Sequence, residues 1–293
     1  MAVQTSIDRM RERITDEIFL ALGLGKDSPL RRGLGWLFYP PTQRFARIFA
    51  RADEAVRQAG MPAGCRSVVT DLNVHYQARG VENLDRKGPL LIVANHPGAY
   101  DSVMLGSCVP RQDLKIIVYE TGFYHALPNI DPWFIYATSE PAGRMLALRQ
   151  AIQHLRDGGS LLQFGSGTIE PDPALFGPSA AEALALWSNS IEIMLRKVPD
   201  TLVVIAMTSG VLLRRFAFHP LTRLRQHPID RRRLAEFMQI IVQLLFPRSV
   251  RVEARLSLAE PATTAELAAE SPDGRLMAPI LARARRLLHD HLR

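Results

Sequence analysis

Cysteine is scarce in this chain of 293 residues, and its two copies, Cys65 and Cys108, have no metal-binding spacing. Neither a structural zinc site nor a disulfide-stapled secreted fold is therefore indicated, and we expect no bound metal. Long apolar runs are also missing. The stretch from Leu202 to Leu213 is interrupted by Thr-Ser-Gly and is shorter than the roughly 20 residues that cross a bilayer as a helix.

A secretory signal is missing as well, because charged residues interrupt the apolar positions throughout residues 7–14. These absences together predict a cytoplasmic protein that is soluble or bound at the periphery of a membrane, on its cytoplasmic face.

Lysine is rare, with 4 copies against 32 arginines, and the formal net charge is +7. Residues 214–233 hold seven arginines and one acid, Asp230, which we expect to cap a helix over 231–246. Arg231–Arg233 would then lie in the first turn, where the helix dipole disfavours cations. The patch indicates binding to anionic lipid or to the phosphates of coenzyme A. A solvated basic face, or an arginine bias of the genome, explains it equally well.

Residues 1–62 are predicted to form an N-terminal helical region that could lie at a membrane interface. An apolar stripe runs through Ile7, Met10, Ile14, Ile18, Leu20 and Leu22. Basic and aromatic residues then alternate over 31–51, a pattern typical of a helix that lies in a lipid headgroup layer. An ordinary helical hairpin packed on the main domain is the alternative.

Residues 63–293 are predicted to form an α/β domain with a central, largely parallel sheet covered by helices. Helices are expected over 143–157, with Met145, Leu148, Ile152 and Leu155 on its apolar face, and over 231–246 and 275–292. They alternate with short apolar or β-rich runs over 68–76, 89–94, 114–119, 134–138, 160–164, 202–207 and 250–258.

The run over 89–94 leads directly into Asn95-His96-Pro97-Gly98-Ala99-Tyr100-Asp101. The carboxyl end of a strand is where open α/β sheets bind ligands. A turn at Pro97-Gly98 would bring His96 to Asp101, which a regular helix could not do. A carboxylate that orients an imidazole favours a general base acting on a hydroxyl. A buried structural histidine, with Asp101 as a helix cap, is the alternative.

Val81-Glu82-Asn83-Leu84, Gly88-Pro89, an apolar strand and then Asn-His-x4-Asp together resemble the opening of the glycerophospholipid (lysophosphatidic acid type) acyltransferase superfamily. The resemblance spans about residues 68–210. It implies transfer of a fatty acyl group from an acyl-CoA or acyl-carrier-protein thioester to a hydroxyl of a lipid acceptor. It further implies His96 as the base and Asp101 as its partner, in a 1-acylglycerol-3-phosphate acyltransferase-like enzyme without a further cofactor.

A second block, Phe164-Gly165-Ser166-Gly167-Thr168, stands where that family has Phe-Pro-Glu-Gly-Thr. Gly165 and Ser166 replace the usual Pro and Glu, and we expect Glu170 to compensate. Free backbone N–H groups in this glycine-rich turn would suit an oxyanion or a phosphate, and a simple tight turn is the alternative.

Two further family blocks are altered. The expected phosphate-binding arginine is absent near Thr138, and the strand at 202–207 lacks its proline. Arg144 is the nearest substitute for the arginine, unless it only covers core surface.

The sequence therefore predicts an O-acyltransferase with His96 and Asp101 as catalytic residues. Its expected partners are a thioester donor, a lipid acceptor and an anionic membrane surface. The predicted substrate-binding residues are Asn95, Arg144, Gly165, Ser166, Gly167, Thr168 and Glu170. A non-catalytic lipid-binding protein on the same fold is the alternative. Nucleic-acid binding is not expected, because no aromatic stacking platform accompanies the arginines.

Overall fold

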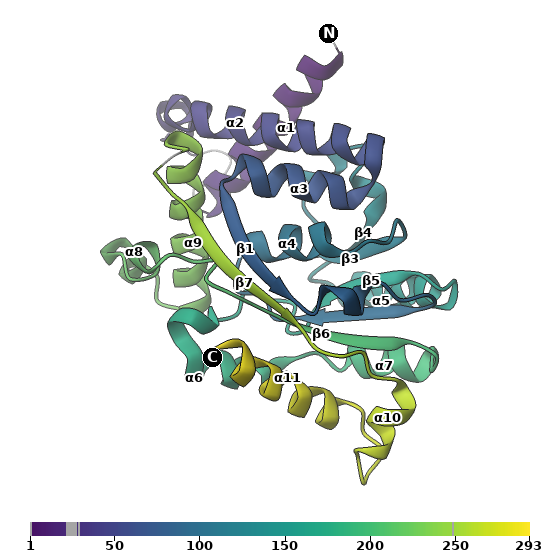
Figure 1. Cartoon of the computed structure of the whole chain (residues 1–293). Coiled ribbons are helices and arrows are strands. Elements are labelled where there is room, and N and C mark those ends of the chain that lie inside the picture. Colours follow the sequence, from purple (N-terminus) through teal and green to yellow (C-terminus); the bar gives the residue numbers. More distant parts are fainter. Residues whose placement is uncertain (1, 22–27, 29, 248) are drawn as a thin grey trace.

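The centre of the molecule is one sheet. In the computed structural model, which describes residues 2–21, 28, 30–247 and 249–293, seven strands pair in the order β1-β7-β6-β2-β5-β3-β4 (Figure 1). Their bounds are β1 (Val74–Arg79), β2 (Leu90–Ala94), β3 (Leu114–Tyr119), β4 (Phe134–Ala137), β5 (Ser160–Phe164), β6 (Leu202–Ser209) and β7 (Val252–Leu258).

Five neighbouring strands, from β6 through β2, β5 and β3 to β4, run parallel. β7 is antiparallel to β6 and parallel to β1, so these last two strands run the other way. The predicted largely parallel sheet is confirmed.

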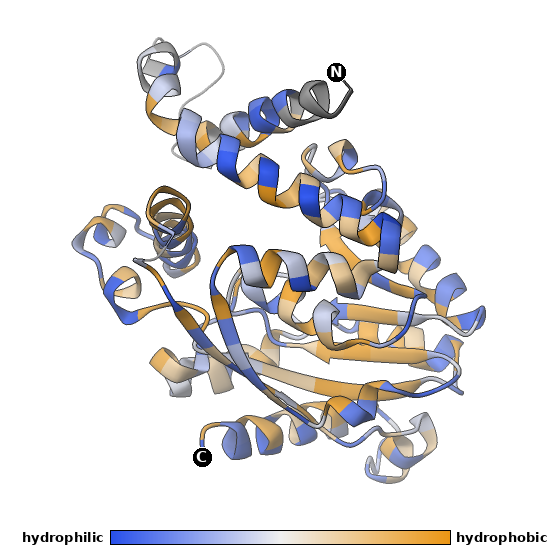
Figure 2. Cartoon of the chain, turned by 45° about the horizontal axis from the view of Figure 1, so that its top comes forward, coloured by the Kyte–Doolittle hydropathy of each residue, from blue (hydrophilic) through white to orange (hydrophobic). Residues whose placement is uncertain are grey.

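Helices cover both faces of the sheet, because successive side chains of a strand point to opposite sides. In β2, Leu90 and Ile92 join one hydrophobic core and Leu91 and Val93 join the other, and all four are fully buried. Figure 2 shows these central strands as predominantly hydrophobic. A strand buried on both faces needs such an unbroken apolar run.

The first core is covered by α1 (Ala2–Ala21), α2 (Leu30–Ala59), α3 (Met61–Asp71), α4 (Tyr100–Cys108) and α9 (Pro228–Leu245). The second is covered by α5 (Pro141–Arg156), α7 (Ser190–Lys197) and α11 (Met277–His291). The remaining helices are α6 (Pro173–Ala183), α8 (Arg214–Ala217), α10 (Thr264–Ala269) and the 3₁₀ turns η1 (Val81–Leu84), η2 (Tyr124–Ala126), η3 (Asp131–Trp133), η4 (Leu184–Leu186) and η5 (Pro220–Leu224).

The N-terminal region is helical, as predicted, but the helices continue to Asp71. The expected boundary between residues 62 and 63 falls in the first turn of α3. Of the predicted N-terminal stripe, Met10 and Ile18 are buried and Ile14 packs against the core. Leu22 and the side chains of Ile7 and Leu20 lie outside the described residues.

The strand predicted to begin at Val68 was placed too early, because Val68 and Val69 belong to α3 and β1 starts at Val74. Met61, Cys65, Val68 and Leu72 recur at helical spacing and are all buried. That helix-period packing outweighs the β preference of two adjacent valines.

Two helix predictions also need correction. α9 begins at Pro228, with His227 as its N-cap, so Asp230 lies in the first turn and does not cap the helix. Proline suits a first helical position, where its missing N–H costs nothing. Arg231 consequently closes the first turn, and Arg232 and Arg233 lie beyond it. On α5 the buried side chains are Ala147, Ala151 and Leu155, whereas Met145 is 49% exposed. Leu148 and Ile152 pack against the second core and Leu155 is buried, as predicted, so only Met145 was assigned to the wrong side of the helix.

Candidate active site

The segment that follows β2 holds the strongest candidate site. Asn95, its first residue, is buried and bonds to the end of the neighbouring strand β6. Its Nδ2 donates to the Thr208 carbonyl at 2.9 Å, and its Oδ1 accepts from the Thr208 N–H at 2.8 Å. Asn95 was predicted to bind substrate. Its contacts instead make it a residue that fixes the segment to the sheet.

His96 and Asp101 meet across the predicted turn. His96 Nδ1 lies 2.8 Å from Asp101 Oδ2, which also accepts the Gly98 N–H at 3.2 Å. Asp101 is in the first turn of α4 and fully buried, whereas the His96 side chain is 24% exposed. A carboxylate only accepts, so Nδ1 carries the proton and Nε2 is left for a ligand. Among the described residues, no hydrogen bond engages Nε2.

Two further contacts hold His96 in place, one through its ring and one through its backbone. It stacks on Phe164, the last residue of β5, with ring centroids 4.3 Å apart. Its backbone carbonyl accepts the Glu170 N–H at 2.7 Å. The neighbouring parallel strands β2 and β5 therefore deliver the two motif segments side by side at one edge of the sheet, where open α/β sheets bind ligands.

The protonation of His96 depends on three carboxyl groups. Burial lowers the pKa of the imidazole, but the charge and hydrogen bond of Asp101 raise that pKa to about 9, with smaller contributions from Glu236 and Glu170. Burial in turn raises the pKa of Glu170 to about 7. These groups form one acid-base cluster at the edge of the sheet, which is typical of a catalytic site.

Glu170 belongs to this cluster. We expected this residue to compensate for the family glutamate that Ser166 replaces. It is buried, and its Oε1 accepts the indole N–H of Trp187 at 3.2 Å. The same indole lies against Gly165, where an added Cβ would be 2.2 Å from the nearest ring atom. Glycine is therefore required at this position by Trp187, which the sequence analysis did not identify.

The turn over 165–168 does not present the free N–H groups predicted for it. The N–H of Gly165 donates to the Ala94 carbonyl at 2.8 Å, and that of Gly167 to the Phe164 carbonyl at 3.2 Å. The N–H of Thr168 donates to Ser166 Oγ at 3.3 Å, and Ser166 Oγ donates to the Thr168 carbonyl at 3.0 Å. None of these three N–H groups is free, because that of Gly165 is bonded to β2 and the other two are bonded within residues 164–168. The tight-turn alternative therefore fits these contacts better than an oxyanion pocket.

Arg144 lies apart from this cluster. It is exposed on the first turns of α5, and its Nη1 donates to the Ser139 carbonyl. α5 follows β4, which is three strands from β2 in the sheet, a separation of about 14 Å at the usual spacing between strands. The structure therefore does not bring Arg144 to His96.

Helix α9 supplies a residue that the sequence analysis missed. Glu236 accepts the Ala99 N–H, inside the segment between His96 and Asp101, and its Oε1 would be 3.1 Å from a Cβ added to Gly98. Burial raises the pKa of Glu236 to about 7, against the opposing effect of the His96 charge. Nothing local marks this glutamate, because it lies 140 residues from His96 on a helix rich in charged residues.

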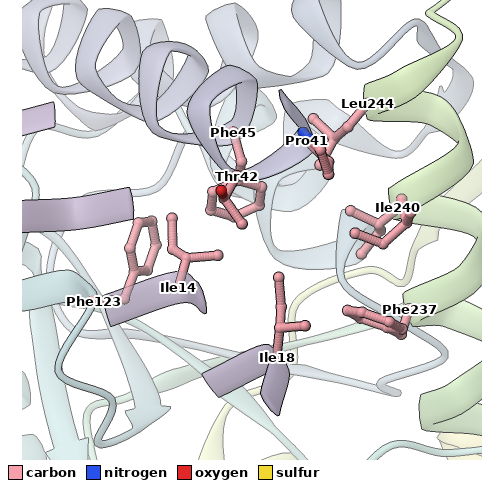
Figure 3. Close-up of a pocket in the computed structure, with 10 residues that line it drawn as sticks. Ile14, Ile18, Pro41, Thr42, Phe45, Phe123, Phe237, Ile240 and Leu244 are labelled. Atoms are coloured by element: carbon pink, nitrogen blue, oxygen red, sulfur yellow. The ribbon is translucent and has the colours of Figure 1, made fainter. Parts of the chain in front are cut away.

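An apolar pocket of about 260 Å³ lies between α1, α2 and α9 (Figure 3). Its lining is almost wholly hydrocarbon and consists of Ile14, Ile18, Pro41, Thr42, Phe45, Phe123, Phe237, Ile240, Ile241 and Leu244. Phe237 follows Glu236 directly in α9, so one helix contributes both to this pocket and to the acid-base cluster.

The surface beside the site is basic and apolar at once. Residues 214–224, here called the basic apolar segment, expose Phe218, Leu221 and Leu224, the last of them 76% exposed. The same segment carries Arg214, Arg215 and Arg223. Trp36 on α2 is 75% exposed. None of the described helices is long and apolar enough to cross a bilayer, and the described side chains form no cluster that could hold a metal ion.

Comparison with known proteins places this site in context. Residues 75–208 match the family model named Acyltransferase, close to the range over which the motifs resemble that superfamily. The predicted resemblance is thereby confirmed. Among solved structures, the 1-acyl-sn-glycerophosphate (LPA) acyltransferase PlsC from Thermotoga maritima is similar, with a TM-score of 0.47, 15% sequence identity and 87% of each chain covered. No curated protein matches the chain.

Proposed function

We propose that this chain, whose residues 75–208 match the acyltransferase family, transfers a fatty acyl group from a thioester to a hydroxyl of a lysophospholipid or related lipid. The observation that carries this proposal is the His96–Asp101 pair. Asp101 holds Nδ1 at 2.8 Å, so Nε2 can take a proton from a hydroxyl placed before it.

His96 Nε2 accepts the hydroxyl proton while the acceptor oxygen attacks the thioester carbonyl carbon. The C–S bond then breaks, and the thiolate of coenzyme A or of a carrier protein leaves and takes the proton from the imidazolium. An ester and a thiol are the products, so the donor is a substrate and no further cofactor is consumed.

Lipid substrates fit the surroundings of the site. The apolar pocket between α1, α2 and α9 suits an acyl chain, because burying each methylene group contributes about 0.8 kcal/mol. The basic apolar segment suits an anionic membrane surface on the cytoplasmic side, with arginines for the headgroups and Leu221 and Leu224 for the layer beneath them.

The test is an incubation of purified protein with labelled acyl-CoA or acyl-carrier protein and a panel of lysophospholipids and other lipid alcohols, followed by identification of the product. His96→Ala should lower the rate by about 10²- to 10⁴-fold without unfolding the protein. His75→Ala, which alters an exposed histidine on β1, is the matched control. Full acyl transfer by a folded His96→Ala protein would contradict the mechanism.

A non-catalytic lipid-binding protein is the second candidate, favoured by one observation. The turn at 165–168 carries Ser166 in place of the family's glutamate, and the N–H groups of Gly165, Gly167 and Thr168 are all engaged by other groups of the protein, that of Gly165 by the Ala94 carbonyl of β2. This candidate predicts that the protein binds lysolipid but never cleaves the thioester above background in the same assay.

A further inference from the structure

Helix α9 presents a polar stripe to the candidate site. Arg232, Glu236, Gln239 and Gln243 recur at spacings of four, three and four, which places them on one side of a helix. Glu236 bonds to the Ala99 N–H, and Gln239 bonds to the Leu213 N–H and the Val211 carbonyl, each at 2.8 Å. The stripe therefore holds the loops that follow β2 and β6.

Arg232 holds the loop that follows β5. Its Nη2 donates to the Ile169 carbonyl at 3.2 Å. The next residue, Glu170, donates its own N–H to the His96 carbonyl at 2.7 Å. Arg232 and the proposed base are thus joined through two consecutive residues of one loop, and both lie within electrostatic range of the Glu170 carboxyl.

Arg232 is left incompletely satisfied. Its Nε is buried without a hydrogen-bond partner, and no ion pair within 4.0 Å joins its guanidinium to any acid in the part of the chain that the structure describes. Burial lowers the pKa of this arginine. A buried donor without an acceptor is costly, and the half-buried guanidinium has only the more distant Glu170 carboxyl as a counter-charge. An anionic group of a ligand would supply both the missing acceptor and a closer counter-charge.

We propose that Arg232 binds the phosphate of an acceptor lipid whose hydroxyl lies at His96. This assignment rests on the proposed acyl transfer and deepens it by naming the acceptor class. Guanidinium groups suit phosphate because several N–H donors converge in one plane. The residue lies outside the matched family segment, residues 75–208, and bonds to the loop that carries Glu170, whereas Arg144 bonds to the Ser139 carbonyl.

The experiment compares two acceptors that differ only in the phosphate, lysophosphatidate and monoacylglycerol. Arg232→Gln should raise KM for lysophosphatidate by about 10- to 100-fold, as loss of a charge-assisted hydrogen bond implies, and change KM for monoacylglycerol by less than about threefold. Arg232→Lys should retain part of the preference. Arg231→Gln is the matched control, because Arg231 is adjacent but exposed, and it should match the parent.

The phosphates of the coenzyme A donor could bind Arg232 through the same contacts as an acceptor phosphate. The KM for acyl-CoA distinguishes these two ligands. A rise confined to acyl-CoA, an equal loss with both acceptors, or no change in either KM would overturn the assignment. Thermal unfolding of each variant shows whether a change in KM results from a folding defect. If the Arg232→Gln protein is unstable, Arg232→Lys provides a variant that keeps the charge.

Binding by calorimetry to His96→Ala protein keeps this proposal distinct from the proposed function. If no acceptor is acylated, the transferase proposal fails, whereas lysophosphatidate should still bind His96→Ala more tightly than His96→Ala/Arg232→Gln. Equal binding by these two proteins, or no preference of the His96→Ala protein for the phosphate-bearing lipid, would overturn the role of Arg232.

Discussion

Replacement of Asp101 by Asn should destabilise the protein in a way that depends on pH. The Asp101 carboxylate is fully buried and shared between His96 Nδ1 and the Gly98 N–H. It raises the pKa of His96 from 6.5 to about 9, in spite of burial. A group whose pKa is raised in the folded state stabilises that state below its unfolded pKa, and the stabilisation is lost as the pH rises through the folded value.

The size of the effect follows from that interval. A pKa increase from 6.5 to about 9 corresponds to about 3 kcal/mol of preferential stabilisation of the imidazolium. Glu236 and Glu170 contribute part of it, and solvent screens a side chain that is 24% exposed. We therefore expect Asp101→Asn to lower the free energy of unfolding by about 2 kcal/mol more at pH 6 than at pH 10.

Urea denaturation of both proteins at pH 6 and pH 10 measures this difference. The new amide adds a cost at both pH values, because Asp101 Oδ1 is buried without a partner and an Asn N–H in its place would be unsatisfied. That cost cancels when the two pH values are compared. In a His96→Ala background the pH dependence should disappear. An equal loss of stability at pH 6 and pH 10 would refute the coupling between Asp101 and His96.

Three further predictions concern the site and its surroundings. A base must be neutral, so kcat/KM should rise with pH up to about 9. Glu236→Gln should move this rise to lower pH, because the Glu236 charge raises the pKa of His96. An unchanged pH profile would show that Glu236 does not influence the base. Ile240→Trp should fill the apolar pocket and shift the preference among thioesters of increasing chain length towards shorter chains, whereas an unchanged preference would remove the pocket from acyl binding. Leu224→Asp should weaken co-flotation with vesicles of anionic lipid, and equal flotation with neutral vesicles would argue against the basic apolar segment.

The order of the strands could not be predicted from the sequence, although most of the strands could. The runs over 89–94 and 160–164 were recognisable because a strand buried on both faces needs uninterrupted apolar residues. Which strand pairs with which depends on contacts between distant segments. That order places β5 beside β2 and β4 three strands away, and it decides that Glu170 reaches His96 while Arg144 does not.

Local chemistry accounts for what the sequence by itself determined about the site. His96, the turn and Asp101 lie within six consecutive residues after a buried strand, so their meeting depends on little beyond that strand and that turn. The second motif, residues 164–168, could be located because it also begins at the end of a buried strand. Its bonding was not predicted, because the partners of Gly165 and Glu170 include Ala94 and Trp187, which other strands and loops deliver.

Only the tertiary structure decided the role of α9. In the sequence, Arg232 and Glu236 belong to the half of a helix in which its charged residues gather, and a charged face usually faces solvent. In the fold this helix lies against the carboxyl ends of the parallel strands, and the same two side chains bond to Ile169 and Ala99. A periodic pattern shows which residues share a helix face, whereas packing alone determines what that face meets.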